Sequence, residues 1–227
     1  MHTPTIYDKD FIDSDYVLIN EDKLHHLENV LRVNLGSKVQ VSNGEGVIGY
    51  GVKDKGNVIK IDKKEKFKQE NKLSIFLSIT NSINRIRFAV EKLTELGIYS
   101  ITIGPTLRSG KKKISLDKAS RWMEASIEQS GAAFIPKLNI VDSIDYSIFT
   151  SCLDMNGLEP FSPKDITNLA IGPEGGWDNK EDAMRRFKNG AGTAPRSGAG
   201  SRSRVQVSDT GFTGYRNRTG RNYVNDM

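Results

Sequence analysis

The sequence predicts an α/β protein in two parts, a small and mostly antiparallel β-barrel followed by a parallel sheet with helices. Up to about residue 62, short strand patterns are separated by turn residues. From residue 73 onward, strand and helix patterns alternate, which is typical of a parallel sheet. A charged connector, DKKEKFKQENK (62–72), separates the two patterns and indicates a domain boundary. We therefore expect a first domain over residues 1–69 and a second over residues 73–188.

Short apolar runs predict the strands of the first part. They are YVLIN (16–20), KVQVS (38–42), VIGYGV (47–52) and NVIKID (57–62). Between the second and third runs, NGEG (43–46) has the residues of a hairpin turn. The stretch EDKLHHLENVLRV (21–33) predicts one helix, because acidic residues fall in its first turn and apolar residues recur at helical spacing. The apolar residues expected on one face are Leu24, Leu27, Val30 and Leu31.

In the second part, apolar runs of strand length alternate with helical patterns. The predicted strands are LSIFLSI (73–79), IYSITI (98–103), KLNIV (137–141) and NLAI (168–171), and the predicted helices cover 83–96 and 115–131. Gly97 stands where a left-handed C-cap ends the first helix. Trp122 and Met123 lie on the apolar side of the second helix and are assigned to the core. Strands alternating with helices predict a parallel sheet covered by helices on both faces.

The stretch IGPEGG (171–176) directly follows the last predicted strand. Its glycines permit positive φ and leave no side chain between the backbone and a ligand, while Pro173 stiffens the loop. Ligands of open parallel sheets bind beyond the carboxyl ends of the strands. The stretch is therefore either a ligand loop or a tight turn between strand and helix. It lacks the Lys-Ser/Thr ending of a P-loop and the spacing of a dinucleotide fingerprint, so a phosphate loop is not predicted.

Composition predicts a soluble protein of the reducing cytoplasm. Hydrophobic residues make up 37% and charged residues 27% of the chain, and no apolar run approaches the roughly 18 residues of a membrane span. The N-terminus is acidic where a signal peptide is basic. Cys152 is the single cysteine, so neither an internal disulfide nor a metal site with His25 and His26 is predicted. The formal net charge of +5 favours a polyanionic partner, and a solvated basic surface explains it equally well.

Five separated motifs resemble, in this order, the RsmE family of ribosomal RNA methyltransferases. They are HHLENVLRVNLGSKVQVSNGEG (25–46), EKLTELGI (91–98), LRSG (107–110), EASIEQSGAAFIP (124–136) and IGPEGGWDNKE (171–181). The resemblance implies S-adenosylmethionine-dependent methylation of N3 of a uridine in 16S ribosomal RNA. It also implies a PUA-like RNA-binding barrel, a SPOUT α/β domain with a trefoil knot at the cofactor site, and a homodimer that acts on the small ribosomal subunit.

The resemblance also assigns roles to residues of this chain. Six residues match the family's cofactor loop: Ile171, Gly172, Pro173, Glu174, Gly175 and Gly176. Arg108 matches a loop facing the catalytic cleft, and Glu128 and Gln129 match the polar end of a helix near that cleft. Loss of the N3 proton needs a base, a water chain or a cation that stabilises the developing anion at the uracil oxygens. Arg108 is the candidate cation, and Glu128 or Glu174 is the candidate acceptor. For Glu128, an exposed carboxylate near a helix end is the structural alternative.

Methylation at N3 requires a free Watson–Crick edge, so recognition is expected to rest on RNA shape and phosphate contacts. The residues expected to bind RNA are Arg32, Arg85, Arg87, Lys111, Lys112 and Lys113. Two alternatives stay open. The three lysines could form a solvated loop, and Arg85 and Arg87 could cover helix surface with their aliphatic stems.

The chain departs from the family pattern at two places. Ala132 stands where the family usually has arginine, which removes a positive charge from the expected cleft. After residue 188, the family's LGxRILRxETA motif and final helix are missing, and lysine, leucine and isoleucine no longer occur. Residues 189–227 are expected to be disordered, either as a natural basic tail or through a shifted reading frame, which we favour. Such a frame shift would weaken cofactor binding, the knot and the dimer. The alternative function is then an RNA-binding protein with an incomplete, inactive methyltransferase domain.

Overall fold

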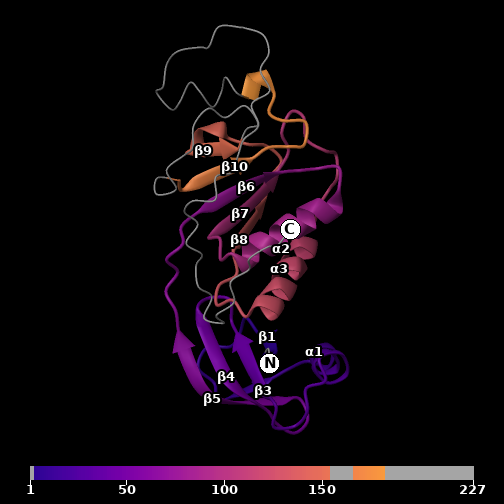
Figure 1. The fold of residues 1–227 in the computed structure, drawn as a ribbon, viewed down its shortest axis with the longest axis vertical. Coiled ribbons are helices and arrows are strands. Elements are labelled where there is room, and N and C mark those ends of the chain that lie inside the picture. Colours follow the sequence, from indigo (N-terminus) through magenta and orange to yellow (C-terminus); the bar gives the residue numbers. More distant parts are fainter. Residues whose placement is uncertain (1–2, 154–165, 182–227) are drawn as a thin grey trace, which may run out of the picture. The chain divides into compact units, whose positions relative to one another are not determined.

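The computed structural model describes residues 3–153 and 166–181 of the 227-residue chain. These residues form a mixed α/β fold in which a mostly antiparallel sheet precedes a parallel sheet (Figure 1). The segment 189–227, for which the sequence predicts disorder, lies outside the described residues.

The first sheet has five strands in the order β1-β3-β4-β5-β2. The strands are β1 (Thr5–Tyr7), β2 (Tyr16–Leu18), β3 (Lys38–Ser42), β4 (Val47–Lys53) and β5 (Val58–Lys66). All neighbours are antiparallel except β1, which pairs in parallel with β3. The predicted hairpin is confirmed, with Gly44 and Gly46 at φ of +71° and +99°. Strand β1 has no counterpart among the predicted strands, because its residues TIY contain no apolar run comparable to YVLIN.

The predicted helix over 21–33 is shorter than expected and continues as a wider turn. Helix α1 covers Glu21–His25, and a π-helical turn, η1, covers His26–Val30. A π-turn holds more residues than an α-turn, so it rotates the residues that follow it. Leu27 is buried as expected, whereas Val30 and Leu31 are exposed. The prediction that these last two residues share the buried face is therefore wrong.

The second sheet has five parallel strands in the order β8-β7-β6-β10-β9. Its elements are β6 (Ser74–Ser78), α2 (Ile83–Glu95), β7 (Ser100–Gly104), α3 (Leu116–Ser130), β8 (Lys137–Ile140), the 3-10 turn η2 (Tyr146–Ile148), β9 (Ser151–Leu153) and β10 (Asn168–Ile171). The predicted parallel sheet and both helices are confirmed. Gly97 and Gly131 end α2 and α3 at φ of +68° and +69°, as local sequence predicts for left-handed caps.

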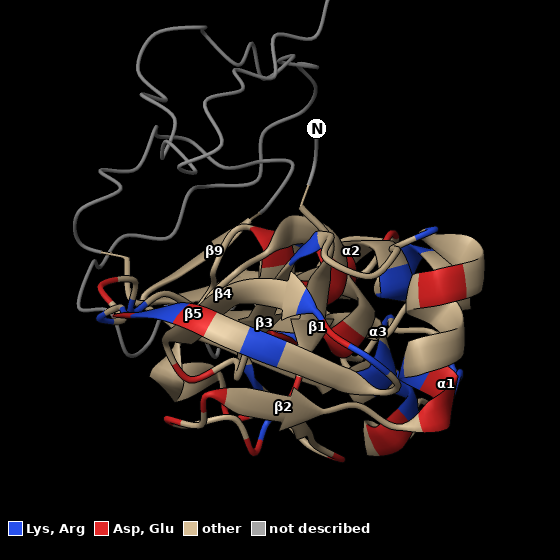
Figure 2. Cartoon of the chain, turned by 90° about the horizontal axis from the view of Figure 1, so that it is seen from below, with Lys and Arg blue, Asp and Glu red and all other residues tan. Residues whose placement is uncertain are grey.

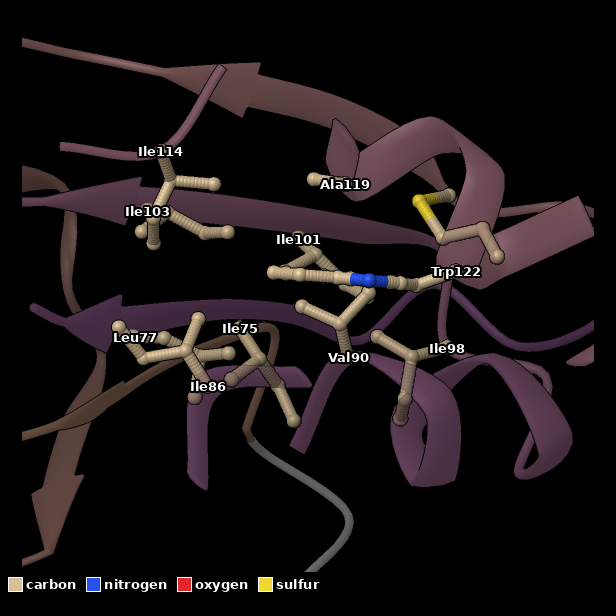
Figure 3. Packing of buried hydrophobic residues seen from close by; sticks show 11 residues of the cluster. Ile75, Leu77, Ile86, Val90, Ile98, Ile101, Ile103, Ile114, Ala119 and Trp122 are labelled. Atoms are coloured by element: carbon tan, nitrogen blue, oxygen red, sulfur yellow. The ribbon is translucent and has the colours of Figure 1, made fainter. Parts of the chain in front are cut away.

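Helices α2 and α3 lie on the same face of the parallel sheet (Figure 1). Both pack on Ile75 and Ile101, and the Trp122 ring and Val90 fill the space between helices and strands (Figure 3). The expectation of helices on both faces is wrong for the described residues. The chain moves from β6 to β7 to β8 in one direction, and right-handed crossovers in one direction place successive helices on one face.

The other face of the sheet is covered by an aromatic cluster. Phe76, Phe149, Ala170 and Trp177 form it, and the rings of Phe76 and Phe149 lie 5.5 Å apart between centroids. Full burial of a phenylalanine side chain such as Phe76 contributes about 1.5–3 kcal/mol. Because Trp177 directly follows the glycine-rich stretch, this cluster ties that stretch to the sheet.

Candidate active site

The carboxyl ends of β6, β7 and β10 meet at one edge of the parallel sheet, where the strand order changes direction. From β6 the chain proceeds to β7 and β8 on one side and then forms β9 and β10 on the other, with β10 next to β6. Ligands of open α/β sheets bind at such a switch point. Three loops follow these strands, namely 79–82 after β6, 105–115 after β7 and 172–178 after β10. We call them the edge loops.

The edge loop after β10 is a tight turn. Gly176 adopts a φ of +71°, and its N–H donates to the carbonyl oxygen of Pro173 at 2.9 Å. At Gly172 a Cβ atom would stand 2.8 Å from the Trp177 ring, so a larger residue does not fit. At Gly175 a Cβ atom would meet nothing closer than 3.9 Å. The turn thus uses some of its glycines for its own geometry and leaves the backbone at Gly175 open to approach.

Trp177 anchors this turn to the sheet. Its side chain is buried, and its Nε1–H donates to the carbonyl oxygen of Leu153 at 2.9 Å. Its ring meets that of Tyr146 edge-on, with 6.3 Å between centroids. The anchor fixes where the chain turns from the glycines into the following helical residues.

Arg108 joins the edge loop after β7 to the one after β10. Its Nη1–H donates to the carbonyl oxygen of Gly175 at 3.2 Å, and its Nε–H donates to the Asp178 carboxylate at 3.3 Å. The pKa of Asp178 lies below its usual value, mainly because the Lys180 backbone N–H donates to the carboxylate and also because Arg108 is near. Arg108 stays 46% exposed, so its guanidinium can also be reached from solvent.

Glu174, at the tip of the turn, pairs with Arg85 from the first turn of α2. Both side chains are largely exposed, at 47% and 67%, so solvent screens the pair and its contribution to stability is small. Three sequence-predicted site residues, Arg85, Arg108 and Glu174, are therefore brought to the same edge of the sheet.

The backbones of the edge loops after β6 and β7 are in direct contact. The Gly110 N–H donates to the carbonyl oxygen of Ile79 at 2.7 Å, and a Cβ atom on Gly110 would stand 2.4 Å from the carbonyl carbon of Thr80. Beneath them, the buried hydroxyls of Ser78 and Thr106 lie 2.8 Å apart. Only glycine fits at position 110.

Glu181 is a site residue that the sequence reasoning missed. Its side chain is fully buried, and its carboxylate accepts hydrogen bonds from Leu107 N–H, Tyr146 O–H and Asp178 N–H. A signal was present, because Asp178 and Glu181 have the spacing of a capping box at a helix start. The Lys180 N–H donates to the Asp178 carboxylate at 3.0 Å and completes that box.

Glu128 and Gln129 lie at the opposite end of α3 from the edge loops. The Glu128 carboxylate accepts from the backbone N–H of Tyr7 at 3.2 Å and lies 3.5 Å from the Lys23 ammonium. Burial raises the pKa of the Tyr7 phenol, with smaller effects of nearby carboxylates, the largest being that of Glu124. Within one chain, the structure does not bring Glu128 or Gln129 beside Arg108.

Ala132 also lies at this opposite end of α3. Its carbonyl oxygen accepts from the Ser42 hydroxyl of β3 at 2.8 Å. The arginine expected there from the family pattern would therefore stand near the first sheet rather than beside the edge loops of the same chain.

The residues predicted to bind RNA are spread over the chain. Lys111, Lys112 and Lys113 are exposed and belong to the edge loop after β7. Arg87 pairs with Glu91 on the surface of α2 at 2.6 Å, in line with the helix-surface alternative. Arg32 is exposed in the first part of the chain and adopts a φ of +56°. Along β5 and on α1, basic and acidic residues lie side by side (Figure 2).

The described residues contain neither a cluster of metal ligands nor a membrane-spanning helix. In the ranges 3–153 and 166–181, no three His, Cys, Asp or Glu side chains gather closely enough to hold a metal ion. None of the helices described there has the length and hydropathy to cross a membrane.

Comparison with known proteins gives a consistent result. The family model described as RNA methyltransferase domain matches residues 68–192. A relative from Borreliella burgdorferi, named ribosomal RNA small subunit methyltransferase E 2, is 25% identical over 200 residues, covering 78% of this chain and 82% of the relative.

Two solved structures share the fold. A predicted RNA methyltransferase from Thermotoga maritima is 26% identical with a TM-score of 0.66, covering 81% of this chain and 87% of that one. A ribosomal RNA small subunit methyltransferase E from Neisseria gonorrhoeae, solved bound to S-adenosyl methionine, is 21% identical with a TM-score of 0.65, covering 82% and 86%. The resemblance indicated by the five motifs is thereby confirmed.

Proposed function

The chain belongs to the RNA methyltransferase domain family, and on this premise we propose that it methylates N3 of a uridine in 16S ribosomal RNA with S-adenosylmethionine as methyl donor. The observation that carries the proposal is the meeting of Arg108, Arg85 and the glycine turn at the switch point of the parallel sheet. The proposal includes the PUA-like barrel over 1–69, an incomplete SPOUT domain over 73–188, the homodimer and a cytoplasmic location.

Residues 171–176 are proposed to hold the cofactor. The open backbone at Gly175, where a Cβ would meet nothing closer than 3.9 Å, fits a bulky ligand lying against the turn. When bound, S-adenosylmethionine supplies an activated methyl group on a sulfonium. The turn is held by Arg108 and by Trp177, so it offers a preorganised surface. Glycine at 172 makes room for the Trp177 ring, and glycine at 176 permits the positive φ of the turn.

Arg108 is proposed to stabilise negative charge on the uracil oxygens as N3 loses its proton. Its guanidinium is already oriented by Asp178 and Gly175, and exposed enough to meet a base. Glu174 is the proposed proton acceptor within the chain. Glu128 and Gln129 take part only if the partner subunit of a homodimer carries them to this edge.

RNA binding is proposed for Lys111 to Lys113 and Arg85, which adjoin the edge loops, and for Arg32 in the first domain. Ammonium and guanidinium groups at these positions would neutralise phosphates. Arg85 and Arg87 are weaker candidates than the three lysines, since Glu174 and Glu91 already engage them. The uridine would have to be unpaired or extruded for its N3 to reach the site.

A second candidate function is RNA binding without catalysis. The observation that favours it is the missing LGxRILRxETA motif after residue 188, which in the family completes the cofactor site. Calorimetric titration of the full chain with S-adenosylmethionine separates the two candidates. Binding supports the methyltransferase, whereas no heat together with retained RNA affinity supports the second candidate.

The reaction itself is tested with small ribosomal subunits whose RNA lacks the modification. The full chain and methyl-labelled S-adenosylmethionine should label 16S RNA, and mass spectrometry of the digested RNA should find 3-methyluridine. Label on another base, or on another atom of uridine, would remove the N3 assignment while leaving the methyltransferase in place. The Lys92→Ala variant is a control that should label RNA like the wild type, because Glu95 already engages that ammonium.

A further inference from the structure

We propose that Glu181 is a positioning residue of the methyl-transfer site: its buried carboxylate sets the place of Arg108 relative to the glycine turn. The inference rests on the proposed function and adds to it a residue that touches neither RNA nor cofactor. Glu181 is fully buried, and charged side chains are almost never fully buried unless they have partners.

Three segments of the chain donate to this carboxylate. Leu107 N–H, from the edge loop after β7, donates to Oε1 at 2.7 Å, and the Tyr146 hydroxyl from η2 donates to the same oxygen. Asp178 N–H donates to Oε2 at 2.8 Å. The segments are 74, 35 and 3 residues away in sequence, so the carboxylate joins parts that no local interaction holds together.

The hydrogen bond from Leu107 to Glu181 matters for the reaction because of where Leu107 lies in the chain. Leu107 directly precedes Arg108, whose guanidinium reaches Asp178 and Gly175. Glu181 thus holds the backbone on which Arg108 stands, and it also holds the N–H of Asp178, the residue that orients the guanidinium. A shift of Glu181 displaces both supports of Arg108 at once.

Helix capping alone does not account for this arrangement. Of Glu181, a capping box requires only that its carboxylate accept from the N–H of Asp178, as Oε2 does. The bonds from Leu107 and Tyr146 come from outside the helix start and serve no cap. All three partners are donors, and the two oxygens of a carboxylate can accept from all of them. A glutamine amide cannot, because in either orientation its NH₂ group would face a backbone N–H.

The test compares full chains of the wild type, Glu181→Gln, Tyr146→Phe and Glu91→Gln. The last variant makes the same chemical change at a carboxylate paired with Arg87 on α2, outside the site. Hydrogen exchange of the Leu107 amide reports the bond directly. Single-turnover methylation at saturating RNA and the dissociation constant for RNA report its consequence.

Glu181→Gln should speed Leu107 exchange about tenfold or more, since the amide loses a buried acceptor. The methylation rate should fall about tenfold or more, because a small misplacement of Arg108 is costly, while the RNA dissociation constant stays within about twofold. Exchange of the Val90 amide in the core should not change, which separates positioning from general unfolding. Glu91→Gln should match the wild type in every measurement.

Unchanged Leu107 exchange and an unchanged rate in Glu181→Gln would overturn the proposal. If that variant does not fold, Tyr146→Phe decides, because it removes one donor and keeps the carboxylate. Faster Leu107 exchange and a slower rate in Tyr146→Phe support the proposal, and wild-type values overturn it. If the wild type itself shows no methylation, the proposed function fails, and the exchange measurement still tests whether Glu181 holds the loop.

Discussion

The guanidinium of Arg108 lies 3.3 Å from the carboxylate of Asp178, a residue 70 positions further along the chain. The pair connects the loop after β7 to the end of the glycine turn after β10. Leu107 and Arg108 both reach this second segment, one through its backbone N–H and the other through its side chain. Two adjacent residues therefore hold the two loops together, and one of them, Arg108, is the expected catalytic cation.

Replacement of Arg108 by alanine should lower the methylation rate at saturating RNA by about 10²-fold, the effect of removing one donor that stabilises a developing anion. The dissociation constant for RNA should change far less, because one exposed cation contributes little to phosphate binding. Single-turnover labelling of small subunits measures the rate. Lys92→Ala is the control with the same charge change outside the site. Unchanged turnover in Arg108→Ala would exclude Arg108 from the mechanism.

A lower pH should weaken the interactions of the Asp178 carboxylate with Arg108 and with the Lys180 N–H. Its pKa in the folded protein is lowered from 3.8, so the folded state binds fewer protons than the unfolded state around that pH. The stabilising contribution is therefore full above about pH 4 and is lost as the pH falls through the lowered pKa. Thermal unfolding of the wild type and Asp178→Asn between pH 3 and pH 6 should show a difference in Tm that shrinks below about pH 4. A difference that is constant over this range contradicts the prediction.

Gly110→Ala should destabilise the protein by about 1–3 kcal/mol, the usual effect of overpacking. The new Cβ would stand 2.4 Å from the carbonyl carbon of Thr80, and neither backbone can give way without moving an edge loop. Gly175→Ala is the matched control, because its Cβ would meet nothing closer than 3.9 Å. Urea unfolding of both variants measures the difference. Equal stability of the two variants would show that the edge loops do not approach each other in solution.

Ile101→Ala should lower the free energy of unfolding by about 2–5 kcal/mol, because it leaves a cavity under both helices. Ile101 is fully buried in the cluster shared by the sheet, α2 and α3 (Figure 3). Leu96→Ala, at a side chain that is 69% exposed, should stay within about 0.5 kcal/mol of the wild type. Denaturant unfolding followed by circular dichroism measures both, and a comparable loss in the two variants would contradict the assignment of the core.

Replacement of Lys111, Lys112 and Lys113 together by alanine should weaken binding to RNA of any sequence by a similar factor. Each phosphate contact contributes about 0.7–0.9 to the slope of log affinity against log salt, so the slope should become shallower by up to about 3. Filter binding over a salt series measures it, with Lys92→Ala as the control, because Glu95 already engages that ammonium. An unchanged slope would assign the three lysines to the solvated-loop alternative.

Local sequence determined many features that the structure bears out. The NGEG turn, the left-handed caps at Gly97 and Gly131, and the start of α3 at Ser115 follow from residues within one or two turns of each site. Helical spacing placed Ile86 and Val90 in the core. Each of these features depends on backbone preference or on neighbours three or four residues away, which a sequence displays directly.

Short strands and long-range contacts escaped this reasoning. Strand β1 owes its existence to pairing with β3, and β9 to pairing with β10, rather than to any period of its own. The motif at 124–136 indicated a single cleft, yet α3 carries Glu128 away from the edge loops and toward β1. A helix of 15 residues is about 22 Å long, so residues at its two ends contact different parts of the protein.

The sequence by itself determined the family, the glycine turn and its place after a strand, because motifs and local conformation are written in consecutive residues. Only the tertiary structure decided that both helices cover one face, that Arg108 meets Asp178, and that Glu181 is the buried acceptor between three segments. Those outcomes depend on the handedness of crossovers and on donors that lie 35 and 74 residues away from one carboxylate. Such contacts exist only in the folded chain.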